Sequence, residues 1–232
     1  MSLPSELRSK AFLTGKITGA ESVSMPHEDM TRLELRIRRA VLRRLLRGQP
    51  VDLDSLSTST RLSPEDLAPV LSKLSDLGAL HAMDGVIIAA YPLSAVPTRH
   101  RIRRDGTIIY ANCALDALAV PFMVEEIVSI ESDCTHCGQA TTVEMSGDRI
   151  LAAHPRSLVV FHVARDSCEA GPAVLTRCPH INFFCGTDHA GRWLAENPGR
   201  SGDVLALPQA VAQACERFAS TISLVRGEEG QR

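Results

Sequence analysis

The sequence lacks the segments that would insert a chain into a membrane or direct it out of the cell. No stretch of the 232 residues approaches the ~20 apolar residues that a membrane-spanning helix requires. The N-terminal residues, from Met1 to Glu6, have neither the basic start nor the apolar run of a secretory signal. The formal net charge of −2 gives no overall electrostatic case for binding nucleic acid or an anionic membrane. We therefore expect neither a membrane nor a nucleic acid among the partners of this chain.

The cysteines cannot all pair within the chain, because their number, seven, is odd. In the absence of an export signal, the sequence predicts largely reduced thiols and a cytoplasmic location. Three of the cysteines are interpreted as packing residues: Cys168, Cys185 and Cys215.

A close pair of cysteines, Cys134 and Cys137, lies in a knuckle-like Cys-x-x-Cys between two predicted strands. A tetrahedral zinc site requires two further ligands, which usually come from a second close pair. The sequence has no second Cys-x-x-Cys, although His154 or His162 could fold near the first. Simple structural thiols are therefore the favoured interpretation, and a structural zinc is the alternative.

Length and composition fit a soluble globular protein of one large domain or two small ones, with 44% hydrophobic and 22% charged residues. Residues 1–30 show no sustained periodicity and are interpreted as a loosely ordered extension. Residues 31–97 are interpreted as a winged-helix-like unit of three helices and a β-hairpin, and residues 98–226 as a mixed domain that carries the catalytic chemistry. Residues 227–232 form a polar tail that should fray. The predicted fold class is α+β.

Helix and turn signals define the N-terminal unit. A first helix over 33–47 carries Arg side chains around an apolar stripe that repeats at every fourth position: Ile37, Val41 and Leu45. A short helix is expected over 53–58, and a third over 63–77, where Ser-Pro followed by acidic residues is typical of a helix start. The run 80–90 centres on Asp84-Gly85, which is a strong hairpin signal.

Antiparallel strands and helices are predicted for the second domain. Asp105-Gly106 should form another hairpin, whose second strand leads into a helix that begins near Cys113 and is limited by Pro121. The remaining elements are expected as strands over 124–132, 140–145 and 157–164, and as helices over 191–196 and 208–222.

The segment from Asn112 to Leu118 carries the strongest chemical signal. It places a thiol, Cys113, three residues before a carboxyl, Asp116, in a run of good helix formers, and such positions share one face of a helix. A second isolated thiol, Cys178, follows about sixty residues later in Arg-Cys-Pro-His-Ile-Asn-Phe-Phe. Two thiols and one acid suggest chemistry on a soft, thiophilic centre with a proton delivered at the same place.

Each of these residues also has an ordinary structural interpretation. Free cysteine is often inert core filler, and a helical Asp is often only a solvated charge. Against this, Cys113 lies near a helix N-terminus, where the macrodipole stabilises a thiolate and can lower the pKa of the thiol. The helix around Asp116 is apolar on nearly every side, so burial should raise the pKa of that carboxyl and make it a plausible proton donor.

Both motifs resemble those of the organomercurial (alkylmercury) lyase family. That family carries a Cys-Ala-Leu-Asp helix start after a Tyr-ending strand, which corresponds here to Tyr110 through Asp116. It also has a later Cys followed by a His and two Phe. The matching residues of this chain are Cys178, His180, Phe183 and Phe184, with Pro121 and Trp193 in fitting positions. The resemblance covers about residues 35–220. The chain departs from the family at Asn112, where members often have an aromatic residue, and at Pro179, where some have a second cysteine.

The resemblance implies protonolysis of a carbon–mercury bond, with release of a hydrocarbon and Hg(II) in mercury detoxification. One of Cys113 and Cys178 would attack the mercury, the other would add, and Asp116 would carry a thiol proton to the leaving carbon. Thiolates are the softest protein ligands and suit mercury, so Cys113, Cys178 and Asp116 would also hold the Hg(II) product. No resident cofactor is expected, because the substrate brings the metal. Small-molecule thiols or a mercuric reductase would accept the Hg(II). His180 could tune the Cys178 thiol or hold its loop.

Two other interpretations stay open. The winged-helix-like unit could belong to a soft-metal-responsive transcriptional regulator, or the cysteines could bind a soft metal without catalysis. The helix over 63–77, which would read DNA, carries Lys73 against three acids, which is poor for a phosphate-lined groove, and its Leu stripe should be buried on the second domain. Asp116 counts against a passive binder, which needs no acid there.

Overall fold

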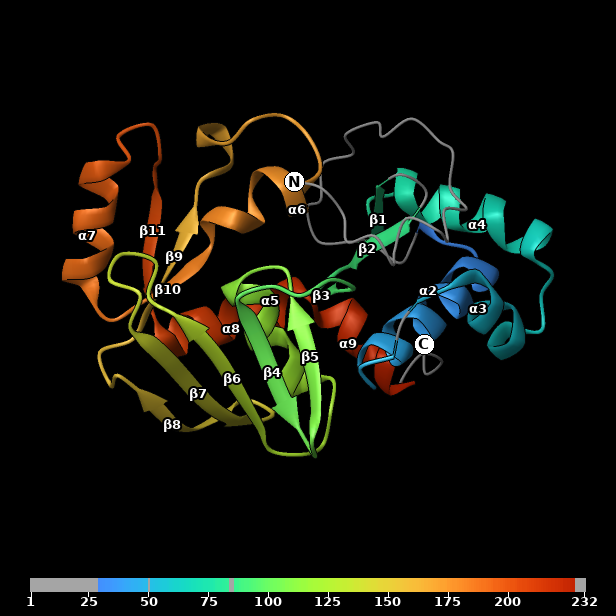
Figure 1. Ribbon diagram of the computed structural model, residues 1–232, viewed down its shortest axis with the longest axis horizontal. Helices are drawn as coiled ribbons and strands as arrows, with labels where there is room; N and C mark the ends of the chain where they lie inside the picture. Colours follow the sequence, from blue (N-terminus) through green and yellow to red (C-terminus); the bar gives the residue numbers. More distant parts are fainter. Residues whose placement is uncertain (1–28, 50, 84–85, 228–232) are drawn as a thin grey trace.

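The computed structural model describes residues 29–49, 51–83 and 86–227 (Figure 1). The expected N-terminal extension, the C-terminal tail and the Asp84-Gly85 turn lie almost wholly outside these residues. Within the described part, no helix is long and apolar enough to cross a membrane. The fold class is α+β, as predicted, with helices at the N-terminal side followed by a strand-rich part.

Three helices form the N-terminal unit: α2 (Arg32–Leu45), α3 (Leu53–Thr60) and α4 (Pro64–Asp76). Thr31 begins α2 through a capping box, and the Ser63 side chain caps α4 ahead of the helical proline. The buried leucine stripe of α4 faces α2, α3 and strand β1. The prediction that this stripe would be buried on the second domain is therefore wrong, because the stripe packs on the other two helices and on β1.

A large sheet begins with the predicted wing, and all its neighbouring strands are antiparallel in the order β1-β2-β3-β5-β4-β6-β7-β8. The short β3 pairs with both β2 and β5, so the wing is continuous with the rest of the sheet. Asp105 and Gly106 both have positive φ, as a tight hairpin requires. The strands are β1 (Leu80–Met83), β2 (Val86–Ala90), β3 (Leu93–Ser94), β4 (His100–Arg104), β5 (Thr107–Ala111), β6 (Val128–Asp133), β7 (Ala140–Ser146) and β8 (Arg149–His154).

A second, three-stranded sheet has the order β10-β9-β11, with β9 (Val159–Val163) at its centre between β10 (Asn182–Phe184) and β11 (Gly202–Ala206). The sequence predicted β9 but neither of its partners. Strand β11 is mostly exposed and β10 has three residues, so neither shows the alternating apolar pattern of a half-buried strand.

The short helix α5 (Ala114–Ala119) is the central element of the second part, and every residue in it is buried. It contacts strands β4 and β5 of the large sheet, β9 and β10 of the small sheet, and helix α8 (Figure 1). The predicted helix over 208–222 is divided at Phe218. The remaining helices are η2 (Val120–Phe122), η3 (Arg165–Ser167), α6 (Ala173–Thr176), η4 (Cys178–His180), α7 (Thr187–Glu196), α8 (Leu207–Arg217) and α9 (Ala219–Arg226).

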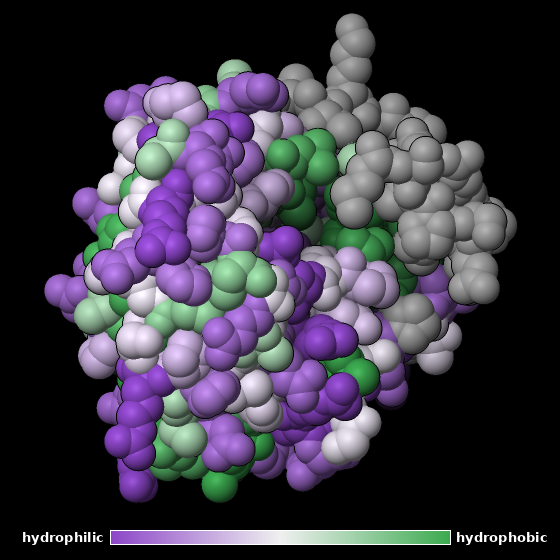
Figure 2. Space-filling view, turned by 60° about the vertical axis from the view of Figure 1, so that its left-hand side comes forward, coloured by the Kyte–Doolittle hydropathy of each residue, from purple (hydrophilic) through white to green (hydrophobic). Residues whose placement is uncertain are grey.

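The last helix, α9, packs back onto the first described helix, α2. Arg38 is one of the arginines around the apolar stripe of α2, yet its side chain is buried. Its Nη2 donates a hydrogen bond to Thr221 Oγ1 at 2.9 Å. Arg43 donates to the Val225 carbonyl at 3.1 Å. These bonds join the N-terminal unit to the last described helix. On the face that Figure 2 shows, hydrophilic residues predominate and hydrophobic ones appear as separate patches.

Candidate active site

Strand β5 and the start of α5 position the first predicted motif. Cys113 follows β5 closely and is the N-cap of α5, with extended backbone, and its Sγ accepts a hydrogen bond from the Asp116 N–H at 3.4 Å. The thiol and the carboxyl therefore lie at the first turn of one helix, as the sequence predicted. The turn ends quickly because Pro121 follows in η2.

The second motif lies at the start of strand β10 of the small sheet. Cys178 begins η4, immediately before β10, and the Ile181 carbonyl accepts a hydrogen bond from the Ala114 N–H at 3.0 Å. This bond fixes the approach to β10 against the start of α5. The Cys178 thiol points to Asp116 Oδ2 at 3.9 Å. The Sγ atoms of Cys113 and Cys178 and a carboxylate oxygen of Asp116 all lie within 4.8 Å of one another, and all three residues are buried.

Burial sets the ionisation of this group. Desolvation raises the pKa of Asp116 to about 6, although Arg217 and the nearby side chains of Cys113, Asn112 and Cys178 oppose the rise. The pKa of Cys178 is raised well above its usual value by its hydrogen bond with Cys113, by burial and by the Asp116 charge. The Cys178 thiol therefore holds its proton tightly, whereas the Asp116 carboxyl can gain or lose one near neutral pH.

Two further residues influence the site without a signal in the sequence. Arg217, at the end of α8, is a positive charge that lowers the pKa values of both Asp116 and Cys178. The Tyr91 hydroxyl accepts a hydrogen bond from the Val174 N–H at 2.7 Å, and burial together with the charges of Cys178 and Asp116 raises the pKa of this phenol. Tyr91 is thus a neutral neighbour. Tyr91 lies just before β3, far in sequence from the site residues. Only the fold, which places α6 beside it, shows that it is near the site.

A cavity of about 560 Å³ opens onto Cys178, with Asn112 and His100 in its wall. Most of the wall is apolar, and it includes Ile88, Val96, Pro97, Val174 and Leu175. Burial and the charge of Arg99 lower the pKa of His100 to about 3, so its ring is neutral, and its Nδ1 lies 3.1 Å from Ser132 Oγ. The cavity thus offers a mostly apolar space next to a thiol, with Arg99 as a charged residue in its wall.

His180 does not share the side of the chain on which Cys178 lies, contrary to the expectation for an extended segment. Residues 178–180 form the turn η4, in which residues two apart point in different directions. The interpretation of His180 as a partner of the thiol loses its geometric basis, and the role of holding the loop is left.

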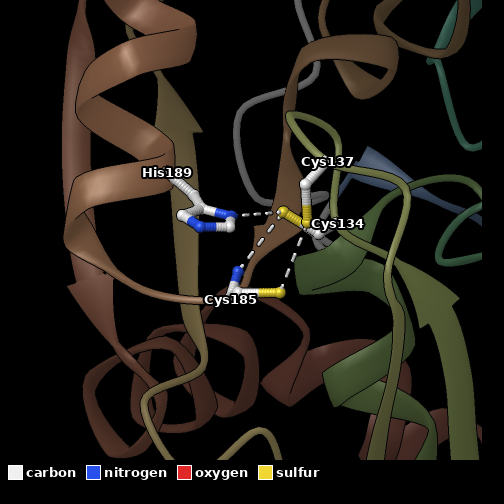
Figure 3. Close-up of side chains that lie close together, drawn as sticks. All are labelled: Cys134, Cys137, Cys185 and His189. Atoms are coloured by element: carbon white, nitrogen blue, oxygen red, sulfur yellow. Dashed lines mark hydrogen bonds between the residues drawn. The ribbon is translucent and has the colours of Figure 1, made fainter.

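The Cys-x-x-Cys pair also has partners other than those proposed from sequence. His162 does not approach it, because its Nε2 lies 3.0 Å from Arg177 Nη2. Instead, Cys185 and His189 lie beside Cys134 and Cys137 (Figure 3). These two residues form a Cys-x-x-x-His pair, a spacing that could have pointed to two further metal ligands. Their distance in sequence from Cys134 and Cys137 left the two pairs unconnected until the fold was known.

Comparison with known proteins gives a consistent result. The family model for alkylmercury lyase matches residues 93–219. The alkylmercury lyase of Staphylococcus epidermidis is 31% identical over 163 residues, which are 70% of this chain and 73% of that protein. The alkylmercury lyase of Bacillus cereus is 29% identical over 172 residues, 74% of this chain and 76% of that one. A crystal structure of the mercury-bound form of MerB2 matches 85% of this chain and 95% of its own, with a TM-score of 0.71 and 25% identity.

Proposed function

Because the chain belongs to the alkylmercury lyase family, and is an organomercurial lyase that cleaves carbon–mercury bonds, we propose that Cys113, Cys178 and Asp116 carry out the reaction. The observation that carries this assignment is the meeting of two thiols and one carboxyl, buried and within 4.8 Å of one another, from motifs far apart in the chain. The regulator alternative has no support from the comparisons.

The first step is the transfer of a thiol proton to the Asp116 carboxylate. The hydrogen bond from the Cys178 thiol to Asp116 Oδ2 supports this transfer, and Cys178 opens onto the cavity through which a substrate would approach. The thiolate attacks the mercury of R–Hg–X and X⁻ leaves. The thiol of Cys113 then adds to the same mercury and loses its own proton. Soft thiolate ligands suit mercury, and their electron donation weakens the Hg–C bond.

Asp116 completes the reaction by giving its proton to the leaving carbon. The electron pair of the Hg–C bond forms the new C–H bond, RH departs, and Hg(II) is left on the two thiolates with the Asp116 carboxylate beside it. Overall, R–Hg–X and two thiols yield RH, X⁻, one proton and the dithiolate complex. A carboxyl with a pKa of about 6 suits this exchange, because it can take up and give back a proton near neutral pH. No resident cofactor is required.

The apolar cavity suits the organic group of the substrate. Its wall of Val96, Pro97 and Leu175 would contact a hydrocarbon R group while the mercury faces Cys178. Small-molecule thiols would then remove the Hg(II) by exchange, with a mercuric reductase as the final acceptor. This chemistry needs reduced thiols, which a cytoplasm maintains, and that supports a cytoplasmic location.

The direct test of the two-thiolate mechanism is hydrocarbon release from an alkylmercurial in the presence of excess free thiol, measured by gas chromatography. Cys113→Ala and Cys178→Ala should each abolish release, because both thiolates must act on one mercury, while circular dichroism stays native-like. Cys215→Ala, which removes a thiol of α8 outside the site, is the matched control and should keep its turnover. Near-normal turnover by either site variant would overturn the two-thiolate mechanism.

A second variant separates catalysis from passive metal binding. Asp116→Asn keeps the size of the side chain but cannot carry the proton, and loss of a positioned acid costs about 10²–10⁴ in rate. Hydrocarbon release should therefore slow at least about a hundredfold, whereas Hg(II) affinity, set by the thiolates, should change far less. Equal losses of affinity and turnover would mean that Asp116 only maintains the structure of the site.

A further inference from the structure

Four potential metal ligands outside the active site meet at the junction of the two sheets (Figure 3). Cys134 directly follows β6, and Cys137 lies in the turn that leads to β7. Cys185 directly follows β10, and His189 lies in the first turn of α7. The large sheet thus supplies one pair of side chains and the segment after the small sheet supplies the other.

The distances among these side chains match those of one tetrahedral site. Bonds of ~2.3 Å to sulfur and ~2.0 Å to nitrogen place tetrahedral ligands about 3.8 Å apart for two sulfurs and about 3.5 Å apart for sulfur and nitrogen. The Sγ atoms of Cys137 and Cys185 are 3.8 Å apart, and Cys134 Sγ is 3.5 Å from His189 Nδ1. All four ligand atoms lie within 4.8 Å of one another.

The backbone around the pair is shaped as a metal-binding turn. The Gly138 N–H donates to the Cys134 carbonyl at 2.8 Å, and Gly138 has a φ of 73°, which a Cβ would strain. The Cys185 N–H donates to Cys134 Sγ at 3.4 Å. A backbone donor to a ligand sulfur is the kind of outer contact that orients ligands and stabilises a thiolate.

We propose that Cys134, Cys137, Cys185 and His189 bind one structural zinc ion. Three thiolates and one imidazole in a closed tetrahedral set are typical of structural zinc. The closed set contrasts with the active site, where two thiols and one acid offer fewer ligands to a soft metal. This proposal replaces the expectation from sequence that Cys134 and Cys137 are simple structural thiols and Cys185 a packing residue.

The zinc has a defined mechanical role in this fold. It joins the β6–β7 turn to the end of β10, where the Thr135 N–H already donates to the Phe183 carbonyl at 3.2 Å. Strand β10 directly follows the turn that carries Cys178. The zinc would hold the C-terminal end of β10 in place. The η4 turn before β10 would then stay fixed against α5, and so would the Cys178 thiol relative to the Cys113 thiol.

The test is the zinc content of the full-length protein, purified from cells grown with added zinc and measured by mass spectrometry of the metal. We expect about one zinc per chain, and at least about a fivefold loss in Cys137→Ser and in His189→Ala. His189→Cys restores a four-ligand set and should retain the metal, which separates loss of a ligand from loss of the fold. Cobalt(II) added to the metal-stripped protein should give the intense visible bands of tetrahedral thiolate coordination.

Two control variants test whether the zinc is bound at this cluster and not at the active-site thiols. The double variant Cys113→Ser/Cys178→Ser should keep its zinc, because the active-site thiols are not ligands of this site, and Cys215→Ser should also keep it. Wild-type protein without zinc, retention of zinc by both Cys137→Ser and His189→Ala, or loss of zinc in the active-site double variant would overturn the proposal. So would a count of thiols in the metal-stripped, denatured protein that is two below the seven of the chain, since that would indicate a Cys137–Cys185 disulfide.

Discussion

Asp116 is the residue of the site that contacts both thiols. Its backbone N–H donates to one thiol and its carboxylate accepts from the other. It lies on a helix with no exposed face, so water cannot stabilise its charge. The same burial that suits the carboxyl to proton transfer must therefore oppose folding whenever the carboxyl is ionised.

This cost gives the residue a measurable pH dependence. The folded-state pKa of about 6 lies above the ~3.9 of an unfolded Asp, so the folded protein binds the proton more tightly. The stabilisation from this proton is present below about pH 4 and is lost as the pH rises through about 6. Asp116→Asn removes the buried charge and should raise the free energy of unfolding at pH 7 by up to about 3 kcal/mol, measured by urea denaturation.

The comparison at pH 4 is the control for this prediction. There the wild-type carboxyl is protonated in the folded protein and about half protonated in the unfolded one, so the difference between wild type and variant should shrink to a small fraction of its value at pH 7. A variant that is less stable than the wild type at pH 7 would contradict the assignment of a raised carboxyl pKa.

Local spacing allowed some of the site to be predicted, but not its surroundings. Cys113 and Asp116 are three residues apart on one turn, so their proximity could be inferred without knowledge of the fold. The family resemblance linked Cys178 to them. Arg217 and His189 lie on helices whose existence was predicted, but the sequence does not say against which element a helix packs. Their contributions therefore became visible only from the tertiary structure.

At the scale of elements, turn chemistry and helix caps were the reliable signals. The hairpin around Asp105-Gly106 and the start of α4 at Ser63 agree with their predictions, because these depend on a few neighbouring residues. Strand β8 was missed, since most of its side chains are exposed and its sequence does not alternate. Strand β6 begins later than expected, because residues 124–127 lead into it from η2 without pairing in the ladder with β7.

The junction of α2 and α9 provides a test at this scale. Thr221→Val keeps the shape of the side chain but removes the acceptor of the buried Arg38 guanidinium. Loss of one partner of a buried hydrogen bond to a charged group costs about 1–3 kcal/mol. We expect the free energy of unfolding to fall by about this amount, as measured by urea denaturation. Ser223→Ala, on the same helix, should have little effect, and equal losses in the two variants would refute the role of the bond.

At the scale of the whole molecule, the winged-helix-like unit is a part of the enzyme's scaffold. Helix α4 carries Lys73 against Glu65, Asp66 and Asp76, and its leucines are buried in the helical core. Its strands continue into the catalytic sheet through β3. The unit thus has neither a cationic recognition helix nor a separate fold to present to DNA.

We accordingly expect no sequence-specific DNA binding. A gel-shift assay with the DNA upstream of the protein's own gene, with and without Hg(II), checks this expectation. Both conditions should leave the DNA unshifted at physiological salt, since an acidic helix is repelled by phosphates. Tight binding that weakens with salt and is released by mercury would instead support a regulator.

The packing of α9 on α2 also means that the last described helix lies against the first one. Gly227, at the end of α9, lies against the Arg39 side chain of α2. Arg38 and Arg43 of α2 donate to residues of α9, and the chain between these two helices carries both cysteine motifs. The contact therefore closes a loop that contains the site. The reaction depends on the distance between the two motifs in space and not on their order along that loop.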